Sequence, residues 1–223
     1  MKNRPEFAPS LICMDLLRAG AQAEVINERA QWFHADLMDL DFVDNAGLGI
    51  PFVKAVATVA KRPVDCHLMV RQLDRWLPRA AMAGATMLTP HIEVTGEKTP
   101  EVLNKIAALG CKAGLAISPE TPVGALVPYL DRVEKVTVMT IRPGFPGAPF
   151  LWETVEKIRE LRAMRDGRRL GFQIEMDGSL SEENFSALRE AGCDVFVAGA
   201  AALFARDDDL AKAFDKMEAA FGL

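Results

Sequence analysis

Short apolar runs alternate with longer amphipathic segments from one end of the chain to the other. Eight runs have the length and composition of buried strands, and we predict strands near residues 7–12, 32–38, 64–70, 87–91, 113–117, 135–141, 172–176 and 195–198. Helix-like segments lie between several of them, at 51–60, 100–109, 151–164 and 182–191. Gly84, Gly110 and Gly192 each follow a helix-like segment and precede a strand, a position typical of the residue that ends a helix.

Eight strands that alternate with helices predict parallel pairing through right-handed crossovers. Within 223 residues the compact form of this α/β pattern is a (β/α)8 TIM barrel, and we expect a single domain over residues 1–223. A doubly wound open sheet is the alternative that the same alternation permits.

The composition is that of an ordinary globular protein, with 50% hydrophobic and 26% charged residues. A formal net charge of -5 argues against a broad nucleic-acid-binding face. The N-terminal residues lack an apolar run of signal-peptide type, and no stretch is long enough to span a membrane, so we expect a cytoplasmic protein. Cys13, Cys66, Cys111 and Cys193 form no Cys-x-x-Cys pair, and we predict that they are reduced thiols.

Polar residues interrupt the apolar strands near their C-terminal ends, which form the active-site rim of a barrel. They recur at alternate positions, which share one face of a strand: His34, Asp36 and Met38, then Asp65, His67 and Met69, then Glu175 and Asp177. Two imidazoles and two carboxylates at one mouth would suit a divalent cation, and zinc, iron, manganese and cobalt are all chemically acceptable. Each of these residues can also be a hydrogen-bonded core residue or a helix N-cap, so the residues alone leave both interpretations open.

Glycine-containing segments follow the last three predicted strands. They are Gly144-Phe145-Pro146-Gly147, Gly178-Ser179 and Gly199-Ala200-Ala201. Glycine lets backbone N–H groups approach an anion, and the loops after the seventh and eighth strands of barrels often bind phosphate, so we predict a phosphate site here. A third histidine, His91, also lies at a predicted strand end, and it would form the wall of the pocket with Met38, Met69 and Met139. The methionines can equally fill space in the core.

These residues resemble the motifs of the ribulose-phosphate 3-epimerase family. The motifs run in family order as Ala8-Pro9-Ser10-Leu11, His34-x-Asp36-x-Met38-Asp39, Asp65-x-His67-Leu68-Met69-Val70, Met139-Thr140-x-x-Pro143-Gly144-Phe145 and Asp177-Gly178. Within the family, the segments 13–17, 65–67 and 175–179 are most similar to the D-allulose-6-phosphate 3-epimerase branch.

The resemblance implies a barrel of the ribulose-phosphate-binding type with one divalent metal ion per subunit. It implies that the metal is held by His34, Asp36, His67 and Asp177. It also implies that Ser10 and His67 contact the substrate and that the glycine segments receive its phosphate. The partner implied is a small ketose phosphate, and we expect a homo-oligomer, a dimer or larger.

The activity implied is inversion at C3 of a ketose phosphate, of the D-allulose 6-phosphate to D-fructose 6-phosphate type. D-Ribulose 5-phosphate or another phosphorylated sugar is the alternative substrate. A metal next to the C2 and C3 oxygens would stabilise the charge of a cis-enediolate. Asp36 and Asp177, one on each face, would then act as base and acid in turn. The second nitrogens of His34 and His67 can be oriented by outer partners, of which Asp65 is a candidate.

Five positions depart from the family pattern. They are Leu40 in place of glycine, Asp44 in place of proline, Arg142 in place of a small acidic or amide residue, Ala148 in place of glutamine, and Ala200 in place of serine or threonine. None removes a metal ligand or an acid/base group, and together they suggest a substrate different from that of the best-known members. Arg142 can pair with an anionic part of the substrate or remain a solvated surface residue.

Other functions fit the sequence less well. A Schiff-base aldolase needs a lysine at the C-terminal end of a strand, whereas Lys112 and Lys135 lie at the opposite ends. A metal-dependent decarboxylase would want a lysine near the metal carboxylate, and the second-strand motif has none. A non-catalytic sugar-phosphate-binding protein would not need Asp36 and Asp177 together with both histidines.

Overall fold

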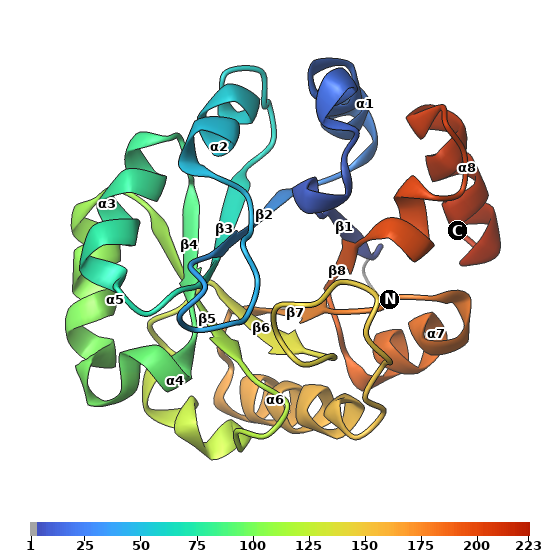
Figure 1. The fold of residues 1–223 in the computed structure, drawn as a ribbon. Helices are drawn as coiled ribbons and strands as arrows, with labels where there is room; N and C mark the ends of the chain where they lie inside the picture. The colour runs from blue at the N-terminus through green and yellow to red at the C-terminus, as the bar shows by residue number, and fades with distance from the viewer. Residues whose placement is uncertain (1–3) are drawn as a thin grey trace.

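The computed structural model describes residues 4–223, in which eight strands are surrounded by helices (Figure 1). The strands are β1 (Glu6–Pro9), β2 (Phe33–Met38), β3 (Val64–Met69), β4 (Met87–Pro90), β5 (Lys112–Ile117), β6 (Lys135–Met139), β7 (Gln173–Asp177) and β8 (Val195–Ala198). The α-helices are α1 (Ala19–Arg29), α2 (Ile50–Ala57), α3 (Leu73–Met82), α4 (Ile92–Thr95), α5 (Thr99–Ala108), α6 (Thr154–Arg168), α7 (Glu182–Ala191) and α8 (Leu210–Ala220). Short helical turns are η1 (Leu11–Cys13), η2 (Leu16–Arg18), η3 (Gly96–Lys98), η4 (Val123–Ala125), η5 (Val127–Tyr129) and η6 (Ala200–Phe204).

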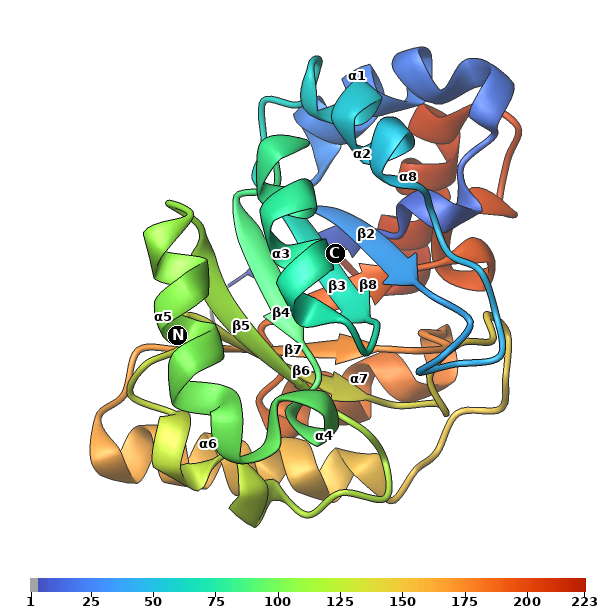
Figure 2. The same cartoon turned by 60° about the vertical axis from the view of Figure 1, so that its left-hand side comes forward.

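The strands form a closed parallel barrel. Their order is β1-β8-β7-β6-β5-β4-β3-β2, and every pair is parallel. A parallel bridge between Ser10 and His34 joins the two ends of this order and closes the ring. The helices lie outside the strands in both views (Figure 1, Figure 2), which is the arrangement that right-handed crossovers produce. The predicted TIM barrel is confirmed, and the open sheet is excluded.

The predicted strands begin within one residue of the observed ones, but two of them end more than one residue earlier than predicted. β1 stops at Pro9 and the chain turns into η1, while β6 stops at Met139. Leu11 and Ile141 prolong the apolar pattern because both are buried beneath neighbouring segments. An apolar residue in the sequence indicates that a position is buried, but it does not show whether the position belongs to a strand. The strand ends where its ladder of backbone hydrogen bonds ends.

Along the inside of the barrel, a polar zone lies between two apolar clusters. One cluster consists of Ala8, Trp32, Met87, Val195 and Val197, and the other of Met38, Val43 and Met69. On β2 and the residue before it, the side chains of one face run Trp32, His34, Asp36, Met38, from apolar through polar to apolar. The fully buried polar residues between the clusters include His34, Asp65, Thr89, Lys135, Thr137 and Glu175. The candidate site is the upper edge of this zone.

The turn after β7 has little freedom. Gly178 has φ 128°, and a Cβ added there would lie 2.5 Å from Ile141 Cγ1 and 2.9 Å from the backbone nitrogen of Ile141. Only glycine fits such a position without displacing the chain. Ser181 and Asn184 then form a capping box that begins α7, and Asn184 Nδ2 donates to the carbonyl of Ser179 at 2.9 Å. These contacts hold the end of β7 in place.

Across residues 4–223, none of the helices combines the length and the apolar character required to cross a bilayer.

Candidate active site

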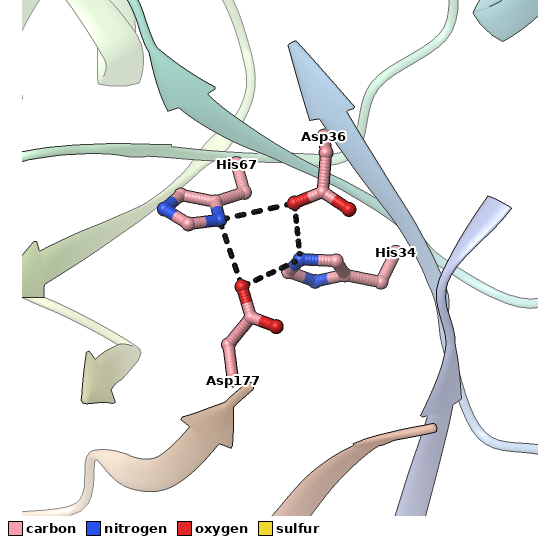
Figure 3. A group of neighbouring side chains, drawn as sticks. All are labelled: His34, Asp36, His67 and Asp177. Carbon is pink, nitrogen blue, oxygen red and sulfur yellow. Dashed lines mark hydrogen bonds and ion pairs between the residues drawn. The ribbon is translucent and has the colours of Figure 1, made fainter. Parts of the chain in front are cut away.

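Four predicted residues meet at the mouth of the barrel. Figure 3 shows His34 and Asp36 from β2, His67 from β3 and Asp177 from β7 pointing toward one another, with the two aspartates at opposite corners. Asp36 Oδ1 lies 3.2 Å from His34 Nε2 and 3.2 Å from His67 Nδ1. Asp177 Oδ2 lies 3.6 Å and 3.1 Å from the same two nitrogens. The register that pairs Asp36 with His67 across β2 and β3 produces this convergence.

This group fits a divalent cation. Its four ligand atoms all lie within 4.8 Å of one another, and two imidazole nitrogens with two carboxylate oxygens suit zinc, manganese, iron or cobalt. Both histidines are fully buried, and Asp36 is nearly so. The cluster could therefore bind a metal, and the donor set leaves the identity of the ion open.

The charges of the cluster stabilise one another. Burial disfavours the imidazolium of His67, but hydrogen bonds to Asp177 and Asp36 outweigh it and raise the pKa to about 9. Burial also disfavours the carboxylate of Asp36, but His34 and His67 hold its pKa below the usual range. A divalent cation would replace the protons that these pairs share.

His91 and the carboxylate of Glu93 lie behind His67, outside the four-residue cluster. His67 Nε2 lies 2.9 Å from His91 Nε2, and His91 Nδ1 lies 3.0 Å from Glu93 Oε2. Glu93 Oε1 accepts the backbone N–H of Ser118 at 2.9 Å, which fixes the carboxylate. If Nδ1 of His67 binds a metal, its Nε2–H donates to Nε2 of His91. The series of hydrogen bonds from His67 through His91 to Glu93 then orients the His67 ring.

Above the cluster is a cavity of about 240 Å³. Its lining includes the predicted substrate residues Ser10, Gly144, Phe145, Pro146, Gly147, Gly178, Ser179, Gly199, Ala200 and Ala201, together with Asp36, Asp177, Met38, Met69 and Met139. The Ser10 hydroxyl donates to Asp36 Oδ2 at 2.8 Å, so one aspartate oxygen is held by serine while the other faces the histidines. His91, which we expected in the wall, lies behind His67 instead and packs against Phe42, with ring centroids 4.7 Å apart.

Two residues in or near the site, Cys13 and Lys135, were not predicted to belong to it. Cys13 lines the cavity, and burial together with nearby Asp36 raises the pKa of its thiol to about 11, so it stays a neutral wall group. Lys135 begins β6 at the predicted N-terminal end, but its side chain is fully buried inside the barrel beside Glu175. A lysine two positions before Thr137 on a buried strand was the signal that could have revealed this polar face.

The residues that depart from the family pattern lie in different parts of the structure, one lining the cavity and others exposed outside it. Leu40 is exposed and has φ 61°, a left-handed conformation that suits glycine better. Arg142 does not line the cavity described above; its side chain is exposed and pairs with Glu120 at 3.2 Å. Ala148 accepts the hydroxyl hydrogen of Ser179 through its carbonyl. Ala200 lines the cavity and has no hydroxyl to donate.

Residues 6–204 match the Ribulose-phosphate 3 epimerase family. The chain is 38% identical over 207 residues to the ribulose-phosphate 3-epimerase of Mycobacterium tuberculosis, covering 93% of this chain and 89% of the relative. It is 35% identical over 213 residues to the ribulose-phosphate 3-epimerase of Escherichia coli (strain K12), covering 95% and 93%. Among solved structures, KGPDC from Streptococcus mutans superposes with a TM-score of 0.71 at 13% identity, covering 99% of this chain and 98% of that one, which shows the barrel fold alone.

Proposed function

The chain belongs to the ribulose-phosphate 3-epimerase family and is an isomerase that acts on carbohydrates, and from this premise we propose that it is a metal-dependent 3-epimerase of a ketose phosphate. The family predicted from the sequence motifs is thereby confirmed, while its D-allulose-6-phosphate branch stays a prediction. The observation that carries the proposal is the convergence of two histidines and two aspartates at the floor of a glycine-lined cavity. We place D-allulose 6-phosphate first among the substrates, because three segments of the sequence resemble that branch.

His34, Asp36, His67 and Asp177 would hold the metal. When bound there, a divalent cation supplies positive charge next to the ketone and hydroxyl oxygens of the substrate, which makes the C3 proton more acidic. After losing a proton, the buried histidines would supply neutral nitrogen ligands, and the partners behind them would keep the rings oriented.

Asp36 and Asp177 carry the proton transfers in this proposal. They come from strands on different sides of the barrel and stand at opposite corners of the cluster (Figure 3). One carboxylate takes the C3 proton from one face, and the other returns a proton to the opposite face; the roles exchange in the reverse direction. Ser10 donates a hydrogen bond to Asp36 Oδ2 and so limits rotation of that carboxylate.

The remaining cavity would bind the phosphate and exclude water. The glycine segments after β6, β7 and β8 all line it, and no lysine or arginine of the described residues does so. A phosphate would therefore be held mainly by backbone N–H groups. Met38, Met69 and Met139 line the same cavity and would form an apolar wall beside the reacting carbons.

D-Ribulose 5-phosphate is the second candidate substrate. The observation that favours it is the name of the relatives, which are ribulose-phosphate 3-epimerases at 35% and 38% identity over most of the chain. The chemistry at C3 is the same for both sugars, so the four-residue cluster does not distinguish them.

The decisive experiment is exchange of the C3 proton with deuterated water, followed by NMR for each ketose phosphate. We expect metal-dependent exchange with one of the two sugars and loss of exchange on chelation. With bound metal verified, Asp177→Asn should abolish abstraction from one C3 epimer and Asp36→Asn from the other, because each base serves one face.

Asp74→Asn is the matched control, since Asp74 is exposed and pairs with Lys105 on the outside of the barrel. It should leave exchange unchanged. Absence of exchange with both sugars in metal-loaded protein would contradict the proposed reaction.

We also propose that the chain forms a homo-oligomer, a dimer or larger. Leu16 and Leu17 in η2 are 61% and 97% exposed, and apolar side chains of this kind are often covered by a neighbouring subunit. Light scattering of the wild type and of a variant with both leucines changed to serine tests this, and a monomeric wild type would contradict it.

A further inference from the structure

A buried ion network lies directly beneath the four-residue cluster. The ammonium of Lys135 contacts Asp65 Oδ2 and lies 2.7 Å from Glu175 Oε2. All three side chains are fully buried. A lysine is buried in this way only when carboxylates compensate for its lost hydration. Apolar side chains could fill this part of the core without the cost of removing charges from water, so packing alone does not account for the network.

Further hydrogen bonds fix the two carboxylates. Thr89 donates to Asp65 Oδ1 at 2.7 Å, and Thr137 donates to Glu175 Oε1 at 2.8 Å. His34, Asp65 and Glu175 form a second group whose ligand atoms lie within 4.8 Å of one another. In this group the two carboxyl side chains contact the ammonium of Lys135. One ammonium thus contacts two carboxyl groups from different strands.

The carboxylates of this network lie next to a buried ring nitrogen of His34 that has no hydrogen-bond partner among the described residues. Within residues 4–223, His34 Nδ1 is the one buried side-chain nitrogen or oxygen that has no hydrogen-bond partner. Asp65 Oδ2, the oxygen that Lys135 contacts, lies 3.4 Å from it, and Glu175 Oε1 lies 3.8 Å away. The other ring nitrogen, Nε2, faces Asp36 and Asp177.

We propose that Lys135 is a positioning residue for the metal centre, acting through Asp65 on His34. By holding Asp65 Oδ2 3.4 Å from Nδ1 of His34, it would keep an acceptor within reach of Nδ1–H when the metal binds, so that the lone pair of Nε2 is directed at the cation. Lys135 does not line the substrate cavity, which separates this role from Schiff-base chemistry. The inference rests on the proposed metal site.

The test is a titration with Co²⁺, whose visible absorption reports both binding and coordination geometry. The main variant is the double substitution Lys135→Met with Glu175→Gln, which removes one positive and one negative charge and so preserves the net charge of the network. Asp65 then loses its anchor while the local field changes little. We expect the dissociation constant for Co²⁺ to rise about 10- to 100-fold, while kcat at saturating Co²⁺ stays within about threefold of the wild type.

Thr137→Val is the matched control, because it removes a hydrogen bond to Glu175 at the same depth without touching Asp65. Its Co²⁺ affinity should stay within about twofold of the wild type, and the free energy of unfolding of each metal-free variant is measured in parallel. An unchanged affinity in the double variant would overturn the inference. The inference would also be overturned if, in the double variant and in Thr137→Val alike, the loss of Co²⁺ affinity were proportional to the loss of free energy of unfolding.

Asp65→Asn provides a second route if the double variant does not fold. It preserves the size of the side chain and should weaken Co²⁺ binding by a similar factor; an unchanged affinity would again overturn the inference. Failure of the wild type to bind Co²⁺ is a different outcome, which would remove the proposed metal site itself.

Discussion

Binding of a divalent metal to the metal-free protein should release about two protons at a pH near 7.5. The reason lies in the two buried histidines. Burial disfavours the charged form of His67, but hydrogen bonds to Asp177 and Asp36 raise its pKa to about 9. Burial acts on His34 in the same way, and Asp36 and Asp177 again outweigh it and raise its pKa well above the usual value. Both imidazoles must lose a proton before Nε2 of His34 and Nδ1 of His67 can bind a cation.

The expected number follows from these pKa shifts. With a pKa of about 9, His67 is about 97% protonated near pH 7.5 and contributes close to one proton. Despite burial, the pKa of His34 is also raised well above its usual value by Asp36 and Asp177, so this imidazole is expected to release the second proton. Because protons compete with the metal, affinity should increase as the pH rises. While both histidines are protonated the increase is about 100-fold per pH unit, and it should flatten as the pH approaches the pKa of His67.

Isothermal titration calorimetry with Mn²⁺ measures this directly. The binding enthalpy is determined in several buffers of different ionisation enthalpy. When the observed binding enthalpy is plotted against the ionisation enthalpy of the buffer, the slope gives the number of protons released. His67→Gln is the internal control and should reduce the slope by about one proton. A slope near zero, or a dissociation constant that stays flat between about pH 6.5 and 8.5, would refute the assignment of protonated histidines to the metal-free cluster.

Two further predictions concern backbone conformation and are measured by denaturant unfolding of the metal-free protein. Leu40→Gly should stabilise the protein by about 1 kcal/mol, because relief of the left-handed strain at φ 61° exceeds the extra entropy of glycine in the unfolded chain. Leu40→Ala keeps a Cβ and should gain nothing, so a glycine variant no more stable than the alanine variant would contradict this reasoning. Gly178→Ala should cost several kcal/mol and impair metal binding, because its Cβ would lie 2.5 Å from Ile141. Gly167→Ala, inside α6 with open space around the added Cβ, should instead add about 0.5–1 kcal/mol, and a similar loss in both variants would show that the close contact is not the cause.

The alternation of apolar and amphipathic segments was enough to predict the barrel and the start of nearly every strand. Both follow from local properties, namely the burial of parallel strands on two faces and the periodicity of helices. The ends of β1 and β6 were placed too late, since Leu11 and Ile141 are buried without belonging to the strand ladder. Backbone hydrogen bonds decide such boundaries, and single residues do not reveal them.

For the candidate site, the sequence by itself indicated that His34, Asp36, His67 and Asp177 reach the mouth. His34 and Asp36 share one face of a strand, and parallel strands bring their C-terminal ends to the same rim, so the four-residue cluster could be predicted before any distance was known. Only the tertiary structure decided which residues lie behind and beneath the four-residue cluster. Lys135 meets Asp65 from 70 positions away and Glu175 from 40 positions away, and His91 lies behind His67 instead of in the cavity wall. The physical reason is that strand periodicity specifies the direction of a side chain, whereas barrel closure and the reach of a long side chain specify its partner.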